Sequence, residues 1–221
     1  MRPRGRDLAG AILALSLAAL FIRVGFWQLH RLQERRARNA QIAAGRARPP
    51  VALPMAHLDP GAVRDRRATA LGVYDYPHER VWAGRTYQGA PGVALLTPLR
   101  LADGSAVFVD RGWVPSADAR RIDAAHYREG DSAAIAGLVL PAPRDRGDVD
   151  PVRLRDSFPY PVLPIVIQLD DTAASHPAGM ARWRTPPLDD GPHLSYAIQW
   201  FSFAGIAVVG TVLLIKKGAT A

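Results

Sequence analysis

The sequence contains no cysteine and only two lysines. The absence of cysteine excludes disulfides, thiol catalysis, CxxC zinc sites and cysteine-held iron–sulfur clusters. The 28 basic residues are 26 arginines and the pair Lys216 and Lys217, and they give the 221-residue chain a formal charge of +8. That excess indicates an anionic partner, either a nucleic acid or a membrane surface. Because nearly half of the residues are apolar, the chain can bury a core and is not expected to be disordered.

Signatures of common catalytic and nucleotide-binding sites are also missing, since no GxSxG, HExxH, Walker or GxGxxG pattern occurs. Asp148 and Asp150 match only a fragment of a calcium loop, which favours a solvated turn. The arginines are dispersed and not interleaved with aromatic residues, so no nucleic-acid partner is expected. Surface or core positions are favoured over metal ligation for four histidines without a second histidine three or four residues away: His57, His78, His126 and His176. We therefore expect no enzymatic activity.

The longest uncharged run, LSYAIQWFSFAGIAVVGTVLLI (194–215), predicts a transmembrane helix. As a helix it would span about 33 Å, close to the roughly 30 Å thickness of the hydrocarbon layer. Lys216 and Lys217 follow the run and Asp189 and Asp190 precede it, which indicates a cytoplasmic C-terminus under the positive-inside rule. The alternative, a buried helix of a soluble protein, is disfavoured by the length of the run and by the two lysines.

A second apolar run, LAGAILALSLAALFI (8–22), lies near the N-terminus and ends at Arg23. The Arg23 side chain can snorkel to the headgroups, so we predict a first transmembrane helix over 8–27. A cleaved signal peptide is the alternative, but bulky FWQLH occupies the place of a cleavage site, which favours a signal anchor. Two spans then place both termini in the cytoplasm and residues 28–192 in one outer domain.

The pattern of the outer domain is helical at first and then mostly β. Residues 31–47 favour a helical stalk that ends at the following prolines. Asp103 and Gly104 predict a hairpin turn, Pro164 predicts an edge or bulge position, and 141–156 is predicted to be a loop. Six short runs rich in β-forming residues predict strands: 66–74, 79–85, 92–100, 105–114, 132–141 and 162–171. The expected fold is an α+β membrane protein, with two transmembrane helices flanking a small, mainly antiparallel β domain of barrel or sandwich type.

The stretch HLSYAIQW (193–200) is the candidate binding site. On a helix that begins after Pro192, the residues His193, Tyr196 and Trp200 share one face. An aromatic belt at the membrane surface accounts for the tyrosine and the tryptophan. A neutral imidazole at this interface also suits a metal centre in apolar surroundings, such as haem iron. Both interpretations stay open on the residues alone.

Four stretches of the chain resemble the Surfeit locus protein 1 family. GFWQLHRLQER (25–35) is similar to the family's segment after the first span, without the Trp-Lys pair often found there. LGVYDYPHERVWAGR (71–85) resembles a family strand, and GVALLTPLRLADGSAVFVDRGWVP (92–115), with its VDRGWVP run, is the most specific match. PHLSYAIQWFSFA (192–204) is similar to the family's approach to the last span. Residues 116–190 add little.

The resemblance implies a non-enzymatic assembly factor of the bacterial cytoplasmic (inner) membrane, with a periplasmic main domain, that serves a haem–copper oxidase, chiefly cytochrome c oxidase. It implies that the protein holds or delivers haem a, with His193 as the iron ligand and Tyr196 and Trp200 beside it. The implied partners are the catalytic subunit of the oxidase, haem a synthase and the lipid bilayer. Arg111 would be a propionate partner or, as we favour, a structural residue. The alternatives are a scaffold that binds no haem and a membrane-anchored enzyme.

Overall fold

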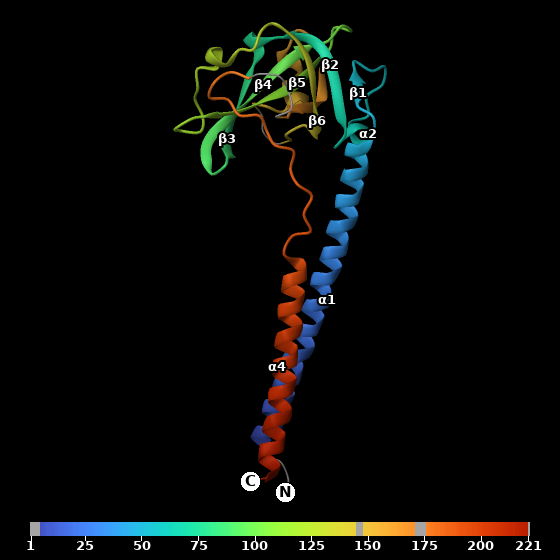
Figure 1. Cartoon of the computed structure of the whole chain (residues 1–221), viewed down its shortest axis with the longest axis vertical. Helices are drawn as coiled ribbons and strands as arrows, with labels where there is room; N and C mark the ends of the chain where they lie inside the picture. Colours follow the sequence, from blue (N-terminus) through green and yellow to red (C-terminus); the bar gives the residue numbers. More distant parts are fainter. Residues whose placement is uncertain (1–4, 145–147, 171–175, 221) are drawn as a thin grey trace. The chain divides into compact units, whose positions relative to one another are not determined.

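The computed structural model describes residues 5–144, 148–170 and 176–220 (Figure 1). The chain divides into two compact units. Residues Met1–Gln41 and Leu188–Ala221 form one of them, called here the helical unit, and Ile42–Pro187 form the other, the barrel unit.

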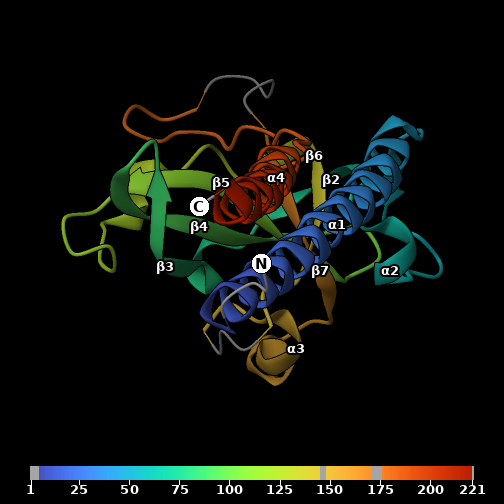
Figure 2. The same cartoon turned by 90° about the horizontal axis from the view of Figure 1, so that it is seen from below.

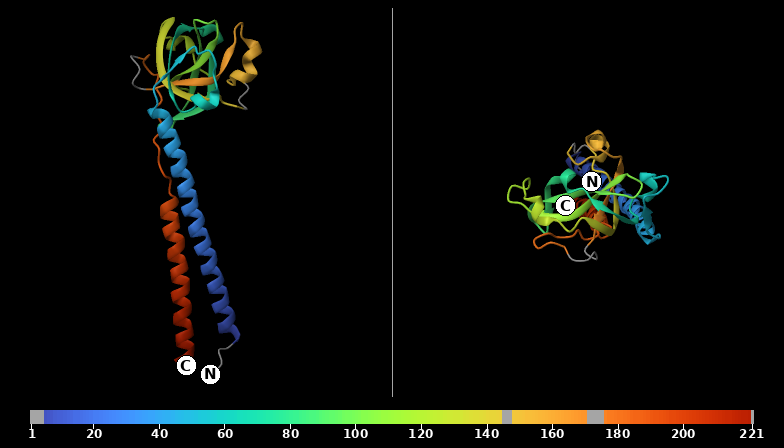
Figure 3. Two further views of the ribbon diagram at one scale, coloured as in Figure 1. Left: turned by 90° about the vertical axis from the view of Figure 1, so that its right-hand side faces the viewer. Right: turned by 90° about the horizontal axis from the view of Figure 1, so that it is seen from above.

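Two long helices make up the helical unit. Helix α1 (Gly5–Ala47) has no internal proline and continues past the predicted span through the predicted stalk, and α4 (His193–Thr220) contains the second predicted span. Leu8–Ala47 and His193–Lys216 are each long enough to cross a membrane, and their most apolar 18-residue segments have mean hydropathies of 2.1 and 2.0. They run side by side (Figures 1 and 3).

Small residues and aromatic rings form the contact between α1 and α4. Ala18 on α1 and Ala204 on α4 are buried, as is usual where two membrane helices approach closely. Gly25 leaves room for the ring of Phe201, because a Cβ at this glycine would lie only 2.7 Å from that ring. Next to this contact, the rings of Phe26 and Phe201 meet edge to face, with 5.3 Å between their centres. The two helices are therefore fitted to each other over several turns.

Seven strands and several short helices make up the barrel unit. In chain order they are β1 (Val51–Leu53), α2 (Pro60–Val63), β2 (Arg67–Tyr74), η1 (Tyr76–His78), β3 (Arg80–Tyr87), β4 (Ala90–Arg100), β5 (Ala106–Pro115), η2 (Ala124–Tyr127), β6 (Ser132–Pro141), α3 (Pro151–Leu154), η3 (Arg155–Ser157) and β7 (Val162–Leu169). Helix α3 lies beside β7 (Figure 2).

Five of these strands close into a barrel in the order β2–β6–β7–β5–β4 and back to β2. The closing contact pairs Val73 with Arg100 and Tyr74 with Leu99. Within the ring only β5 and β7 are parallel, while β3 and β1 add to the sheet outside it. This is a Greek-key barrel of the OB-fold kind, which does not by itself define a function. The predicted fold class is thus confirmed, and the sandwich alternative is wrong.

Apolar clusters lie on both faces of the closed sheet. The inner cluster includes Val107, Val109 and Ile167, all fully buried. A second, aromatic cluster is built on Phe108, Phe158, Trp113 and Trp183 and packs on the other face of β4 and β5. Because both faces are covered, the central residues of these two strands are buried without alternation.

The six predicted strands all occur, with ends shifted by no more than two residues. Gly104 has a positive φ of 83° in the predicted turn, and Pro164 lies where the register of β5 and β7 shifts, as expected for a bulge. The predicted loop 141–156 is wrong in part, since it contains α3 and the start of η3, while its residues 145–147 lie outside the described residues. Asp150 is not a solvated turn residue, because it is 4% exposed and accepts a hydrogen bond from the amide of Val152.

Candidate functional site at the start of the second membrane helix

His193 is the first residue of α4 and faces α1. Its Nδ1 lies 2.9 Å from Oε1 of Gln28 on α1. The positive φ of Gly191, 68°, turns the chain just before Pro192 and the helix. The histidine is half-buried, so one side of the ring contacts protein and the other remains accessible.

The contact with Gln28 determines which ring nitrogen is free. An amide oxygen accepts, so Nδ1 is the nitrogen that carries the proton, and Nε2 keeps its lone pair. Nε2 has no hydrogen-bond partner in the described ranges of the chain. A side chain at residue 191 would begin 3.7 Å from Nε2, and glycine leaves this space open. A histidine held at one nitrogen and open at the other is the usual arrangement of a metal ligand.

The segment before His193 is attached to α1 by three polar side chains, which we call the latch. Arg36 Nε donates to Asp190 Oδ2 at 2.8 Å. Asn39 Nδ2 donates to the backbone oxygen of Asp189 at 2.7 Å, and Arg35 Nε donates to the same oxygen at 3.1 Å. The latch fixes the start of α4 against α1, and this places His193 opposite Gln28.

The other two predicted site residues, Tyr196 and Trp200, lie further along α4 than His193. Trp200 packs at 5.6 Å from the ring of Phe21 on α1. Tyr196 is 44% exposed. Trp27 is 54% exposed, and no ring contact joins it to Trp200 in the described structure. His193 and Trp200 thus contact α1, and a binding role of the three residues stays a prediction.

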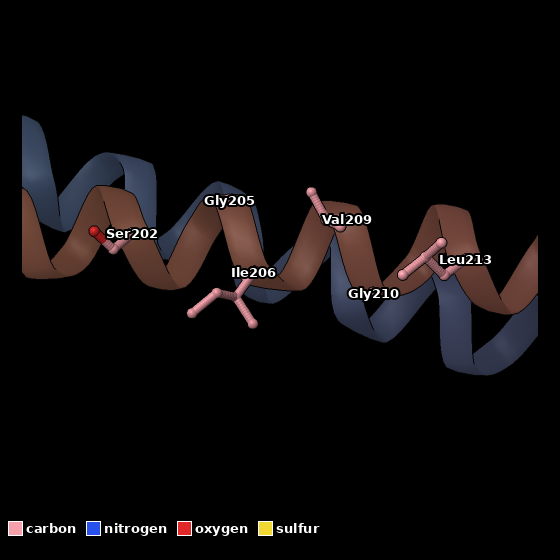
Figure 4. Close-up of a pocket in the computed structure, with 6 residues that line it drawn as sticks. All are labelled: Ser202, Gly205, Ile206, Val209, Gly210 and Leu213. Carbon is pink, nitrogen blue, oxygen red and sulfur yellow. The ribbon is translucent and has the colours of Figure 1, made fainter.

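A shallow apolar groove runs along the opposite face of α4 (Figure 4). Its lining residues are Ser202, Gly205, Ile206, Val209, Gly210 and Leu213. With 100° of rotation per residue, these lie about half a turn away from the stripe of His193, Ala204 and Thr211. A ligand held by His193 on the α1 side therefore does not extend into this groove.

Arg111, the arginine of the VDRGWVP run (109–115), is fully buried inside the barrel unit. Its guanidinium contacts the carboxylates of Glu79 at 2.6 Å and Glu129 at 2.9 Å, and its Nε donates to Thr97 Oγ1 at 2.7 Å. Arg182 also pairs with Glu129. Burial alone would lower the pKa of Arg111, but the Glu79 carboxylate beside it raises that pKa above its ordinary value. Because these partners saturate the guanidinium, Arg111 has a structural role.

A small polar hollow of the barrel unit is lined by Ser116, Asp123, His126 and Tyr127, among others. Serine, histidine and aspartate side chains are all present, but the acceptors 2.9 Å from the Ser116 hydroxyl are Asp118 Oδ1 and the backbone oxygen of Arg121 rather than a histidine. Within the described residues, no group of three or more His, Asp or Glu side chains could hold a metal ion.

Comparison with known proteins identifies relatives of the chain. The sequence profile of the SURF1 family matches residues 15–205. A SURF1-like protein of Monosiga brevicollis is 27% identical over 244 residues, which cover 97% of this chain and 90% of the relative. A SURF1-like protein of Mycobacterium tuberculosis (strain H37Rv) is 28% identical over 230 residues, which cover 95% and 83%. The matches include the stretches around Gln28 and His193.

Proposed function

The chain belongs to the SURF1 family, and from this premise we propose that it is a non-enzymatic assembly factor of a haem–copper oxidase in which His193 binds the iron of haem a. The observation that supports a haem ligand is the bond between His193 Nδ1 and Gln28, which leaves Nε2 free. Haem supplies an iron that accepts an axial nitrogen ligand. The partners that this role implies are the catalytic subunit of the oxidase and haem a synthase.

The position of His193 along α4 fits a ligand at the membrane surface. From His193 to Lys216 the helix rises about 35 Å, and the hydrocarbon layer is about 30 Å thick. With Lys216 at the cytoplasmic boundary, His193 would lie a few ångströms outside the hydrocarbon on the other side. We propose accordingly that the barrel unit lies in the periplasm of a bacterium and that both termini lie in its cytoplasm. The apolar tail of haem a could then remain in lipid while the iron binds at the interface.

The latch supports a site that keeps its shape. Arg35, Arg36 and Asn39 hold the start of α4, so the imidazole does not have to be ordered when a ligand binds. Pre-ordering reduces the entropic cost of binding. A single protein ligand on the iron remains weak enough to be exchanged for the ligands of an acceptor protein, as a delivery role requires.

The test is to purify the full chain from cells that synthesise haem a and to record its absorption spectrum. We expect the wild type to retain haem a and His193→Ala to lose at least nine-tenths of it. His30→Ala is the matched control, because His30 is an exposed imidazole on α1 near Gln28 that pairs with Glu34 at 3.3 Å. This control should retain wild-type haem.

Two results would contradict the proposal. A wild-type protein without haem that still restores oxidase assembly would indicate the scaffold function. A His193→Ala variant with the haem content of the wild type would show that another residue binds the iron.

A further inference from the structure

Arg23 is an exposed arginine within the first apolar span of α1. Within the residues that the structure describes, its guanidinium has no hydrogen bond, ion pair or ring contact. The acidic residues of α1 are Asp7 and Glu34, which lie about 24 Å and 16 Å away along the helix axis. Glu34 already pairs with Arg31 at 2.8 Å, and the sequence of α4 contains no acidic residue. The charge of Arg23 is therefore not balanced by either membrane helix.

Arg23 lies on the side of α1 that faces away from α4. Gly25 and Gln28 contact α4. With 100° of rotation per residue, Arg23 is about 140–160° around the helix from both of them. Trp27 is about 40° from Arg23 and one turn further out, and it is 54% exposed. The two residues thus form an exposed pair, a cation and an indole, on the face that α4 leaves open.

The depth of this pair in the membrane follows from the contact between Gln28 and His193, which puts these two residues at one level. In the proposed topology that level is a few ångströms outside the hydrocarbon. The Cα of Arg23 lies about 7.5 Å deeper than that of Gln28, just inside the hydrocarbon, and Trp27 lies at the boundary, where indoles are favoured. Because a charge in hydrocarbon is costly, the guanidinium extends outward to the phosphate layer of the periplasmic leaflet.

The group in this layer that balances the charge is a phosphodiester, to which the planar guanidinium donates two parallel hydrogen bonds. In a zwitterionic phospholipid an ammonium group already compensates the phosphate, whereas phosphatidylglycerol has no such cation. The outer part of the helical unit is also positive on balance, since four arginines over 28–41 exceed the three carboxylates of Glu34, Asp189 and Asp190. Both arguments favour a lipid with a net negative charge.

We propose that Arg23 and Trp27 form a binding site for one anionic phospholipid, such as phosphatidylglycerol, in the periplasmic leaflet. Arg23 binds the phosphate, and Trp27 packs against the glycerol and the upper part of an acyl chain. The inference rests on the proposed membrane topology and not on the binding of haem, because the pair faces away from His193. A lipid bound here holds α1 at a fixed depth and so keeps His193 at the membrane surface.

The experiment is native mass spectrometry of the full-length, detergent-solubilised protein after incubation with equimolar dioleoyl phosphatidylglycerol and dioleoyl phosphatidylcholine. The variants are Arg23→Gln, Trp27→Leu, and Arg23→Lys, which keeps the charge without the planar fork. Arg38→Gln is the matched control, because Arg38 is an exposed arginine on the same side of α1, about 22 Å further out. The absorption spectrum of each preparation measures its haem, and circular dichroism melting verifies that each variant is folded.

We expect the wild type and the Arg38 control to retain one phosphatidylglycerol in preference to phosphatidylcholine. Arg23→Gln should lower the bound phosphatidylglycerol about fivefold, the factor that corresponds to one arginine at an anionic surface. Arg23→Lys and Trp27→Leu should retain intermediate amounts, and all of these variants should keep the haem content of the wild type.

Equal retention of the two lipids by the wild type would overturn the inference, and so would an Arg23→Gln variant that retains as much phosphatidylglycerol as the Arg38 control. If haem is lost only in His193→Ala, either result leaves the proposed function standing. The opposite pattern, in which the lipid depends on Arg23 but His193→Ala keeps its haem, would support the inference and contradict the haem ligand alone.

Discussion

The buried charge cluster of the barrel and the start of α4 use polar side chains in opposite ways. In the barrel, Arg111 is inaccessible and meets Glu79, Glu129 and Thr97, so its donors are used within the protein. At the start of α4, His193 is half-buried and has one polar partner, Gln28. The first arrangement leaves nothing for a ligand, whereas the second orients a group and leaves one of its atoms available. This difference separates residues that maintain the fold from residues that can bind.

The largest expected effect is on the barrel. Arg111→Met removes the positive charge between two buried carboxylates and should lower the free energy of unfolding by about 3–5 kcal/mol. Urea unfolding followed by near-ultraviolet circular dichroism measures this loss. Arg38→Met, at an exposed arginine of α1, is the control and should change it by no more than about 0.5 kcal/mol. An Arg111 variant as stable as the control would show that Arg111 does not stabilise the fold.

A second effect concerns Asp110, which is 1% exposed and accepts a hydrogen bond from Trp183 Nε1 at 2.8 Å. Burial raises the pKa of Asp110 to about 6 from an ordinary 3.8. The unfolded chain therefore ionises first as the pH rises, and this group removes up to about 3 kcal/mol of stability between pH 4 and 6. Below pH 4 the group has no effect on stability.

Asp110→Asn should remove this pH dependence while keeping an acceptor for Trp183. The difference in stability between variant and wild type, measured by urea unfolding at pH 4 and pH 8, should shift in favour of the variant at the higher pH. A difference that is the same at both pH values would show that the carboxylate is not desolvated. Asp110 would then not be a second buried group, beside Arg111, that serves only the fold.

At the start of α4, the residue to change is Gln28, which orients the ring of His193. Gln28→Leu removes the acceptor for His193 Nδ1, and we expect a roughly tenfold loss of haem affinity, about 1.4 kcal/mol. Gln28→Glu keeps an oxygen acceptor and should restore most of the affinity. A spectrophotometric haem titration of the three proteins measures both effects. Equal affinity in Gln28→Leu and wild type would show that Gln28 does not orient the ring.

The smallest effect is expected for the exposed Arg36–Asp190 pair of the latch, in which 2.8 Å separates Arg36 Nε from Asp190 Oδ2. A double-mutant cycle with Arg36→Ala and Asp190→Ala should give a coupling below about 1 kcal/mol at low salt. The coupling should approach zero at 1 M salt, where exposed charges are screened over about 3 Å. A large, salt-independent coupling would mean that the latch resembles the barrel cluster.

Local sequence was sufficient for most elements of the fold. The strands and the Asp103–Gly104 turn were predicted because their signals lie within a few residues. The pairing of Val73 with Arg100, which closes the barrel, and the parallel contact of β5 and β7 join distant segments and have no local signal. Strand β1 was missed because its three residues lie between prolines, and it forms only by pairing in parallel with β2.

The candidate site was predicted in part for the same reason. His193 was found from its place before an apolar helix, but Gln28 lies 165 residues away, and only the packing of α4 on α1 pairs them.

The latch also has a consequence for the order of events during synthesis. Arg36 and Asp190 are 154 residues apart, and a chain made from its N-terminus folds its earlier segments first. The acidic residues can meet the arginines only after the whole barrel segment between them has been synthesised. Closure of the latch, and with it the alignment of His193 and Gln28, is therefore a late event in biogenesis. A chain that stops before residue 189 cannot present the oriented imidazole.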